Sequence, residues 1–438
     1  MESCSRISFP QQEVVNIPGI KLERYRWKIY LLLSFSFLIA FFHRYAIGVI
    51  SNMLGSDLEL TATQLGTISS LYYYAYGILQ VPVGVLTDKF GVRKITTAGM
   101  ASITLGSLFF ALASGRPLAY SGRLLIGIGS AVFFISTLKT ISVWFPPGAY
   151  TKLLGWTSLI GNTGALLAAT PYSLLVGLTG WRTSYLLFTA IAGVMMVSIW
   201  LIVRDSPRDL GLDPEFEVEE DERSFGQIAA GIKRMAGTMQ FWLYFFIASA
   251  LMGSFMSLSG LWLVPYMMHV YDFTRNAAAN LVVVVTLGML IGSALLGWAE
   301  SKIGSRVKMI RIAVIFNLLV WTYIIVLEGA QPPFAVLLGI LFALGIVGMF
   351  ILTSFTNVKM MFPDLKGSAT GVINIAPFLG TIIFNFLIGW RLDANWTGEM
   401  MESSRVYTLQ GYQQGFGIVL FFSAIALLLS FKLESLEQ

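Results

Sequence analysis

The feature that most constrains this chain is a series of apolar segments that repeats from one end of the sequence to the other. Each segment is long enough to cross the hydrocarbon core of a bilayer, which takes about 20 apolar residues in a helix. Hydrophobic residues make up 56% of the 438 residues and charged residues only 12%, a composition too apolar for a soluble enzyme of this length. The sequence therefore predicts an all-α protein that crosses a membrane many times.

About twelve windows satisfy the length and apolarity of a spanning helix. A hydrophilic linker at 204–238 divides them into two sets of six, so we expect two pseudo-symmetric six-helix halves at 28–203 and 239–432. The remaining residues are expected to form an amino-terminal tail, 1–27, and a carboxy-terminal tail, 433–438. The predicted transmembrane helices are 28–53, 64–87, 94–114, 117–143, 151–178, 183–203, 239–268, 277–299, 309–328, 334–359, 367–390 and 412–432.

The distribution of basic residues predicts how these helices are oriented. The chain has 29 Lys and Arg for a formal net charge of +5, and most of them fall on the side that holds both termini. Because cytoplasmic loops carry an excess of Lys and Arg, we expect both termini in the cytoplasm and the protein in the plasma (inner) membrane. The first 27 residues lack an apolar core followed by a cleavage site, which indicates a tail and no cleaved signal peptide. The basic residues predicted on the opposite side are Arg116, Arg123, Arg182, Arg275, Arg391 and Arg405.

The two halves share short sequence patterns. The stretch GVLTDKFGVRK at 84–94 recurs as GWAESKIGSRVK at 297–308, and WFPPGAYTKLLG at 144–155 recurs as MFPDLKGSATGV at 361–372. The copies are separated by nearly the same distance in both cases, which indicates that the second half is a diverged copy of the first. The first loop carries Gly84, Asp88, Gly91, Arg93 and Lys94, while the second has its acid at Glu300.

Two six-helix halves and a G-x-x-x-D-x-x-G-x-R-[KR] loop after the second helix resemble the major facilitator superfamily of secondary transporters. The resemblance implies a substrate site near the middle of the membrane, between two halves that move around it. Gly91 permits a tight turn between two helices. Asp88 is expected to face the amino terminus of the eleventh helix and to latch the cytoplasmic side there. The residues of these loops to which we assign a role in gating are Asp88, Gly91, Arg93 and Glu300.

Two basic residues fall inside predicted helices. A charge near the middle of a spanning helix costs at least about 2.5 kcal/mol, so it usually faces a water-filled cavity or a partner. Arg44 lies about midway along the helix 28–53, on a face that also carries Ser36 and Gly48, and we expect it to bind substrate. Lys139 lies nearer to a helix end, so it either lines the same cavity as a binding residue or extends its charge to the membrane surface.

The predicted helices hold no Asp or Glu well inside their spans. A buried carboxylate is the usual proton carrier of a proton-coupled transporter. His43, next to Arg44, is the one conventional titratable side chain at that depth in the sequence, so we consider it as a coupling residue. The alternative is that a lone histidine beside an arginine serves the structure.

Polar and aromatic residues in the same helices complete the candidate binding site. Tyr72, Tyr76 and Gln80 follow one another at four-residue spacing and therefore share a helix face. The alternative for each candidate is packing or hydrogen bonding between helices, which is the more frequent role of such residues in membranes. The further candidates for substrate binding are Asn162, Trp262, Asn357 and Asn374.

The stretch from Arg44 to Arg93 is similar to the branch of the superfamily that carries organic anions, including anion:cation symporters for sugar acids. The shared pattern consists of the arginine of the first helix, Y-x-x-x-Q-x-P-x-G at 76–84 and R-x-x-x-G at 123–127, followed by W-F-P at 144–146. The resemblance implies that Arg44 contacts an anionic group of the substrate and that Arg123 acts in the extracellular part of the cycle. The chain departs from the pattern where this branch often has acids, at His43 and Ser130.

We therefore predict a secondary active or facilitative transporter that moves a small organic anion, a carboxylate, by alternating access. A transporter of a neutral or zwitterionic solute such as an amino acid or dipeptide is one alternative, and a non-transporting receptor or scaffold is another. An enzyme is disfavoured, because the sequence has no phosphate-binding loop, nucleophile motif or metal-ligand cluster. We expect a small-molecule substrate, a surrounding lipid bilayer, no cofactor, no nucleic acid partner and a monomeric protein.

Overall fold

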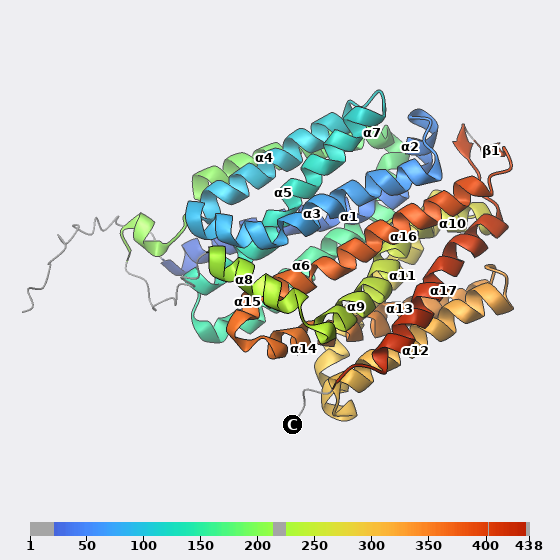
Figure 1. The fold of residues 1–438 in the computed structure, drawn as a ribbon. Coiled ribbons are helices and arrows are strands. Elements are labelled where there is room, and N and C mark those ends of the chain that lie inside the picture. Colours follow the sequence, from blue (N-terminus) through green and yellow to red (C-terminus); the bar gives the residue numbers. More distant parts are fainter. Residues whose placement is uncertain (1–21, 213–224, 402, 435–438) are drawn as a thin grey trace, which may run out of the picture.

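The computed structural model describes residues 22–212, 225–401 and 403–434, except for the side chains of residues 225–229, 366 and 367. Long helices lie side by side along a common direction and form nearly all of the described molecule (Figure 1). Parts of three predicted segments lie outside the described residues. They are residues 1–21 of the amino-terminal tail, 213–224 of the linker and 435–438 of the carboxy-terminal tail.

The helices of the first predicted half are called the N-terminal group here. Two short 3-10 helices, η1 at Pro147–Ala149 and η2 at Pro207–Leu210, connect or follow its long helices. The helices of the group are α1 Leu22–Val49, α2 Ser51–Asp57, α3 Ala62–Phe90, α4 Val92–Ala111, α5 Arg116–Trp144, α6 Tyr150–Leu167 and α7 Thr170–Ile202.

The C-terminal group begins with α8, which packs on α9 and α15. Two long helices contain a stretch of π-helix, and a short antiparallel hairpin of β1 and β2 follows α16. The elements of the group are α8 Phe225–Ala236, α9 Met239–Ser257, η3 Leu258–Trp262, α10 Leu263–Val270, α11 Arg275–Ile303, α12 Arg306–Thr322, η4 Tyr323–Leu327, α13 Phe334–Gly348, η5 Met349–Leu352, α14 Thr353–Met361, η6 Pro363–Leu365, α15 Lys366–Ile373, α16 Ile375–Ala394, β1 Met400–Met401, β2 Ser404–Arg405 and α17 Leu409–Ser430.

Nine helices among the described residues are long and apolar enough to cross a membrane. The predicted spans 64–87, 94–114 and 151–178 correspond to α3, α4 and α6, which are long enough but less apolar than this criterion asks. Each of these three helices packs along a helix that satisfies the criterion for crossing a membrane, since α4 lies on α5, α3 on α16 and α6 on α1. The fold is an all-helical membrane bundle, and twelve crossings remain a prediction.

The predicted spans 151–178 and 183–203 meet inside α7. Gly180 has φ 77° and ψ 161°, which are not helical values, so α7 consists of two helices that meet at this residue. Glycine adopts a positive φ without the steric cost that a Cβ atom brings. The break that the sequence predicts between residues 178 and 183 therefore has its physical cause in Gly180.

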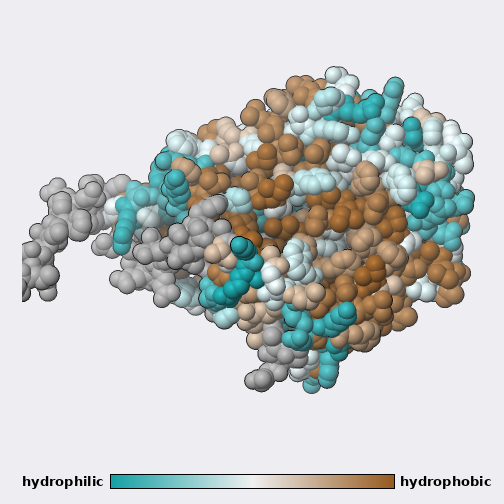
Figure 2. Space-filling view, in the orientation of Figure 1, coloured by the Kyte–Doolittle hydropathy of each residue, from teal (hydrophilic) through white to brown (hydrophobic). Residues whose placement is uncertain are grey.

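The sides of the bundle are apolar. Large apolar side chains are exposed on several helices, among them Leu178, Val194, Leu319 and Leu428. Figure 2 shows hydrophobic residues, in brown, across the middle of the molecule and hydrophilic residues, in teal, toward its two ends. A soluble monomer rarely exposes a contiguous apolar surface of this extent. The surface fits a lipid bilayer and supports the prediction of a multi-pass membrane protein.

The bundle has two ends, which we name after two carboxylates. The Asp88 end holds the turn from α3 to α4, and the Asp393 end holds the turn from α16 to the hairpin. The two helix groups touch where α1 packs on η3 and α10, α3 on α16, and α7 on α11. Near the Asp393 end, a Cβ atom on Gly48 would lie 2.9 Å from the carbonyl oxygen of Gly260. Glycine thus lets helices of the two groups meet backbone to backbone at that end.

Candidate functional site

Arg44 lies in the second half of α1 and is buried, with 7% of its surface exposed. Its guanidinium is surrounded by aromatic rings. The Cζ atom lies 4.4 Å from the ring centre of Phe41, 4.8 Å from that of Tyr76 and 5.5 Å from that of Phe378. The electron-rich face of such a ring attracts a cation. Because Phe378 belongs to α16, both helix groups contribute to the surroundings of this charge.

The charge of Arg44 has no acidic partner among the described residues. The ion pairs found there join other cations to other acids, and the buried Nε atom of Arg44 has no hydrogen-bond partner within the same part of the chain. Burying a charge without a counter-charge costs several kcal/mol, and a desolvated cation–π contact returns only about 2 kcal/mol. The aromatic rings are therefore the neighbours that offset part of the cost of burying this charge.

Hydrogen bonds connect the neighbours of Arg44 across the two groups. Nδ2 of Asn374, between α15 and α16, donates to Oε1 of Gln80 on α3 at 3.1 Å, and Gln80 in turn donates to the backbone carbonyl of Tyr76 at 3.5 Å. The ring of Tyr72 stacks on that of Tyr76, with centres 5.9 Å apart. Of the predicted substrate residues, the structure brings together Arg44, Tyr72, Tyr76, Gln80 and Asn374.

The structure separates Lys139 from this site. Its Nζ atom lies 2.6 Å from Oδ1 of Asp88 and donates to the backbone carbonyl of Thr87 at 3.2 Å. About three helical turns of α3 lie between these residues and Tyr76. In this structure a nearby carboxylate neutralises the ammonium group of Lys139, and its role in substrate binding stays a prediction.

Three further predicted residues make their contacts elsewhere. Asn162 donates to the backbone carbonyl of Ser158 in its own helix at 2.9 Å, and Asn357 donates to the Tyr244 hydroxyl at 3.1 Å within the C-terminal group. Trp262 is buried in η3 and lines a small pocket at the Asp393 end, where its Nε1 atom has no hydrogen-bond partner in the described part of the chain. Sequence position alone does not distinguish a local hydrogen bond from a ligand contact.

His43 points into the N-terminal group, because neighbouring residues on a helix point about 100° apart. Its Nε2 atom lies 3.4 Å from the Ser107 hydroxyl on α4. The ring centres of Tyr185 and Phe188 on α7 lie 5.6 and 5.8 Å from that of the histidine. These contacts all belong to one helix group, so the surroundings of His43 are those of a packed residue and its coupling role stays a prediction.

Arg123 is fully buried behind the site. It donates to the backbone carbonyl of His43 at 2.9 Å and to that of Ile68 at 3.4 Å, and its Cζ atom lies 5.3 Å from the ring centre of Tyr72. The sequence places Arg123 among the basic residues on one side of the membrane; the structure shows that it is buried, and its side of the membrane stays a prediction. Two carbonyl groups and an aromatic face hold the guanidinium inside the N-terminal group.

The loop at the Asp88 end is held by contacts within one group. Gly91 has a φ of 85° and joins α3 directly to α4, and the Asp205 carboxylate occupies the place where a side chain of residue 91 would lie. Asp205 also accepts a hydrogen bond from the backbone N–H of Arg93 at 2.8 Å. The guanidinium of Arg93 donates to the backbone carbonyl of Trp200 at 2.9 Å. Gly91 and Arg93 therefore fasten this turn to the end of α7.

The two acids of the repeated loops also pair within their own groups. The predicted contact of Asp88 is with the amino terminus of the eleventh helix, whereas the partner that the structure gives it is Lys139. Glu300 forms an ion pair with Arg306 at the corresponding place of the second copy. Among the described side chains the partner of Asp88 is thus Lys139, and a latch to the eleventh helix stays a prediction.

Two aromatic residues of the site are absent from the sequence prediction. Phe41 precedes Arg44 by three residues and therefore shares its helix face, so helical spacing is a signal that identifies it. Phe378 comes from the other helix group. The proline before it, Pro377, marks the region of α16 but does not indicate which way the ring points.

Helices that fit a bilayer, with a buried and unpaired cation between two helix groups, are typical of a membrane transporter. The chain belongs to the Major Facilitator Superfamily, whose sequence model matches residues 33–385. The probable galactarate/D-glucarate transporter GarP of Escherichia coli is 28% identical over 204 residues, 44% of this chain and 44% of the relative. The probable sulfoacetate transporter SauU of Cupriavidus necator is 23% identical over 376 residues, 80% of this chain and 85% of the relative.

This chain therefore spans less than half of the length of GarP in that match. Among solved structures, a bacterial homolog of the human lysosomal transporter Spinster, in an inward-facing and occupied conformation, is similar in fold. It has a TM-score of 0.72 at 16% sequence identity, over 95% of this chain and 97% of that chain. At this identity the likeness establishes the fold alone.

Proposed function

We propose that this chain carries a small organic anion, a carboxylate, across the membrane by alternating access. The observation that supports this function is Arg44, a buried guanidinium with aromatic neighbours and, among the described residues, no acid. A carboxylate accepts two parallel hydrogen bonds from the planar guanidinium group. The relatives GarP and SauU are named for galactarate, D-glucarate and sulfoacetate, which are all anions.

The amides beside the charge favour a substrate that also carries hydroxyl groups. An amide both donates and accepts hydrogen bonds, so Gln80 and Asn374 match hydroxyls on the carbon chain of a carboxylate. Gln80 belongs to the N-terminal group and Asn374 to the C-terminal group. A substrate that replaces the hydrogen bond between them would contact both groups, and its binding would depend on how far apart they stand.

The proposal includes the arrangement in the membrane. Twelve helices, six on each side of the linker, cross the plasma (inner) membrane of a monomeric protein with both termini in the cytoplasm. The Asp88 end then faces the cytoplasm and the Asp393 end faces the outside. The two halves at 28–203 and 239–432 are part of this proposal.

In this orientation the contacts between the groups near the Asp393 end close the outer path to Arg44. A substrate at Arg44 then exchanges with the cytoplasm. We assign the change between inward-facing and outward-facing states to a movement of one helix group against the other. The residues assigned to it are His43, Asp88, Gly91, Arg93, Arg123 and Glu300.

Transport into proteoliposomes tests the role of Arg44. The assay uses a panel of carboxylates with and without hydroxyl groups and compares the wild type with Arg44→Ala and Arg44→Lys. We expect Arg44→Ala to lose at least roughly 30-fold in transport of the preferred anion, since breaking a buried charge contact costs about 2–5 kcal/mol. A matched control is Arg116→Ala, which removes an arginine from an exposed position.

The lysine variant and a competition experiment refine the result. Loss of transport in Arg44→Lys as well as in Arg44→Ala indicates a bidentate hydrogen-bonded contact, which the ammonium group of lysine does not replace. Neutral amides of the same acids should not compete, whereas competition by these amides would favour a neutral or zwitterionic substrate. Normal carboxylate transport by Arg44→Ala would overturn the assignment.

A further inference from the structure

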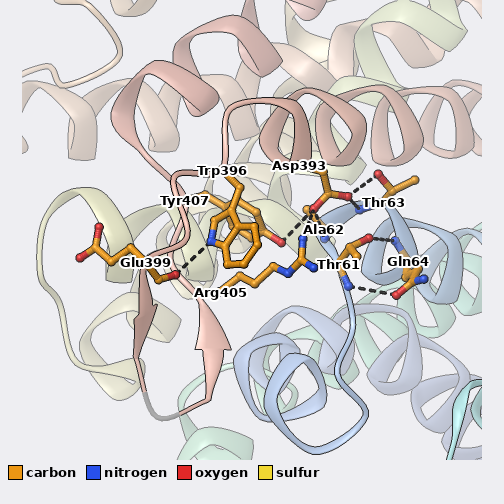
Figure 3. A network of polar contacts seen from close by, with 9 residues as sticks. All are labelled: Thr61, Ala62, Thr63, Gln64, Asp393, Trp396, Glu399, Arg405 and Tyr407. Atoms are coloured by element: carbon orange, nitrogen blue, oxygen red, sulfur yellow. Dashed lines mark hydrogen bonds and ion pairs between the residues drawn. The ribbon is translucent and has the colours of Figure 1, made fainter.

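Asp393 joins the two helix groups at the end that bears its name (Figure 3). It lies in the last turn of α16, and its carboxylate meets the first turn of α3. Oδ1 accepts a hydrogen bond from the backbone N–H of Ala62 at 2.9 Å. Oδ2 accepts one from the backbone N–H of Thr63 at 2.8 Å and another from the Thr63 hydroxyl at 2.5 Å. One carboxylate of the C-terminal group thus binds three donors of the N-terminal group.

The start of α3 leaves these backbone donors available. The first N–H groups of a helix have no acceptor within the helix. Thr61 and Gln64 form a capping box, in which the Thr61 hydroxyl accepts from the Gln64 N–H at 3.3 Å and the Gln64 side chain accepts from the Thr61 N–H at 3.0 Å. The N–H groups of Ala62 and Thr63 lie between these capped positions. A negative charge at this place is also favoured by the helix dipole.

Asp393 has partners in its own group as well. Nη1 of Arg405 lies 3.6 Å from Oδ1, and the Tyr407 hydroxyl donates to the same oxygen at 3.2 Å. The Arg405 guanidinium is held over the ring of Trp396, with Cζ 4.0 Å from the ring centre. Burial, and then the charge of Asp393, raise the pKa of Tyr407, so its phenol remains a neutral donor. These partners stay with the carboxylate wherever the C-terminal group moves.

We propose that Asp393 and the first turn of α3 form a reversible outer latch that breaks each time the transporter opens to the outside. The latch rests on the proposed alternating-access function. Each side keeps polar partners after the two groups separate. Arg405 and Tyr407 continue to bind the carboxylate, and the Thr61 cap continues to hold the start of α3. Water replaces Asp393 at the two N–H groups. The contact therefore favours the outward-closed state without making it permanent.

Asp57 provides a matched control for this charge. It is a second carboxylate at the same end of the bundle, at the end of α2. Its partners are Arg182, with which it forms an ion pair, and the indole of Trp181, which donates to it at 2.9 Å. All three residues belong to the N-terminal group. Asp57→Asn therefore removes a charge from the same surface and leaves every contact between the groups in place.

The test measures access to the outer path and needs no substrate. Cys4 is the only cysteine of the chain, so Cys4→Ser gives a background without thiols. Leu65→Cys then places a single thiol at a buried residue that lines the small pocket between the groups at the Asp393 end. The protein with Cys4→Ser and Leu65→Cys is called the reporter protein, and the further variants are made in it. The purified protein in lipid nanodiscs is labelled with a membrane-impermeant maleimide. We expect Asp393→Asn to label roughly tenfold faster than the reporter protein, the effect of losing one charge-assisted hydrogen bond, and Asp57→Asn to label at the reporter's rate.

Equal labelling of Asp393→Asn and the reporter protein would overturn the latch, and so would an equal acceleration by Asp57→Asn. Thermal unfolding of each variant shows whether it remains folded. If Asp393→Asn does not fold, Thr63→Val removes one of the three donors and should still accelerate labelling. Because no substrate enters the assay, normal transport by Arg44→Ala together with faster labelling of Asp393→Asn would reject the binding site and retain the latch.

Discussion

The two ends of the interface between the helix groups use polar contacts differently. At the Asp393 end some hydrogen bonds cross from one group to the other, as Asp393 does with α3 and as Ser173 does with Asn276 at 2.5 Å, beside ion pairs that stay within a group. At the Asp88 end the described ion pairs stay within a group. Asp88 binds Lys139 there, and Arg234 binds Asp364 through two hydrogen bonds of 2.9 and 2.7 Å.

The difference shows that the same kind of contact has two roles in this fold. Contacts that cross the interface determine which end is closed, because they are lost when the groups separate. Contacts within a group are kept during such a movement, so they determine the shape of the group that moves. Substitutions at the two ends are therefore expected to change different measurable quantities.

The largest effect is expected where a side chain would hold the closed end apart. Gly66 on α3 lies against the backbone carbonyl of Asn385 on α16, and a Cβ atom would overlap it. Overpacking costs typically 1–3 kcal/mol, so we expect Gly66→Ala to lower carboxylate uptake by up to roughly 100-fold. Gly177→Ala is the control, because a Cβ atom there meets no atom within 4 Å. Normal uptake by Gly66→Ala would show that this close contact is not needed for transport.

The next effect concerns the hydrogen bond that crosses the groups beside Arg44. Asn374→Ala leaves Gln80 without this partner and removes a group that a substrate hydroxyl contacts. We expect the KM for a hydroxylated carboxylate to rise about tenfold, which corresponds to the free energy that a single hydrogen bond contributes to binding. Asn162→Ala is the control, since Asn162 bonds to its own helix. A larger rise for Asn162→Ala than for Asn374→Ala would return Asn162 to the binding site.

A smaller effect is expected when the latch loses only its hydroxyl donor. Thr63→Val keeps the shape of the side chain and both backbone donors, so labelling of Leu65→Cys should be about threefold faster. Thr67→Val is the matched control, because the Thr67 hydroxyl donates to the carbonyl of Thr63 within α3 at 2.8 Å. If both variants label alike, the hydroxyl of Thr63 does not contribute to closure.

The smallest effect is expected at the Asp88 end. Lys139→Ala breaks a solvent-exposed ion pair inside the N-terminal group, a contact worth at most about 1 kcal/mol. Labelling of Leu65→Cys at the opposite end should stay within about twofold of the reporter protein. A strong acceleration would mean that the two ends are coupled through the N-terminal group, and the comparison between them would then fail.

Much of the N-terminal side of the site could be predicted from the sequence. Arg44 is conspicuous in an apolar helix, and the four-residue spacing of Tyr72, Tyr76 and Gln80 places them on one face of a single helix. These are local properties of one or two helices. The break between the predicted spans that end at 178 and begin at 183, where the structure has Gly180, is likewise predicted from the local sequence.

The contacts between the groups could not be predicted in this way. Phe378 and Asn374 reach Arg44 and Gln80 from α16, and their positions depend on how two bundles are packed together. The pairing of Lys139 with Asp88 could not be predicted either, because Asp88 lies on another helix. Asp393 lies just beyond a predicted span, where an acid is unremarkable until the start of α3 is placed beside it.

The aromatic rings around Arg44 have a consequence for the carrier when it is empty. An empty carrier must pass through a state in which its site is shut off from water on both sides, and a bare guanidinium would oppose that passage. Cation–π contacts with the rings of Phe41, Tyr76 and Phe378 stabilise part of this charge. For the proposed transporter, the rings therefore lower the barrier to the return of the unloaded protein, which permits net transport of cargo in addition to exchange.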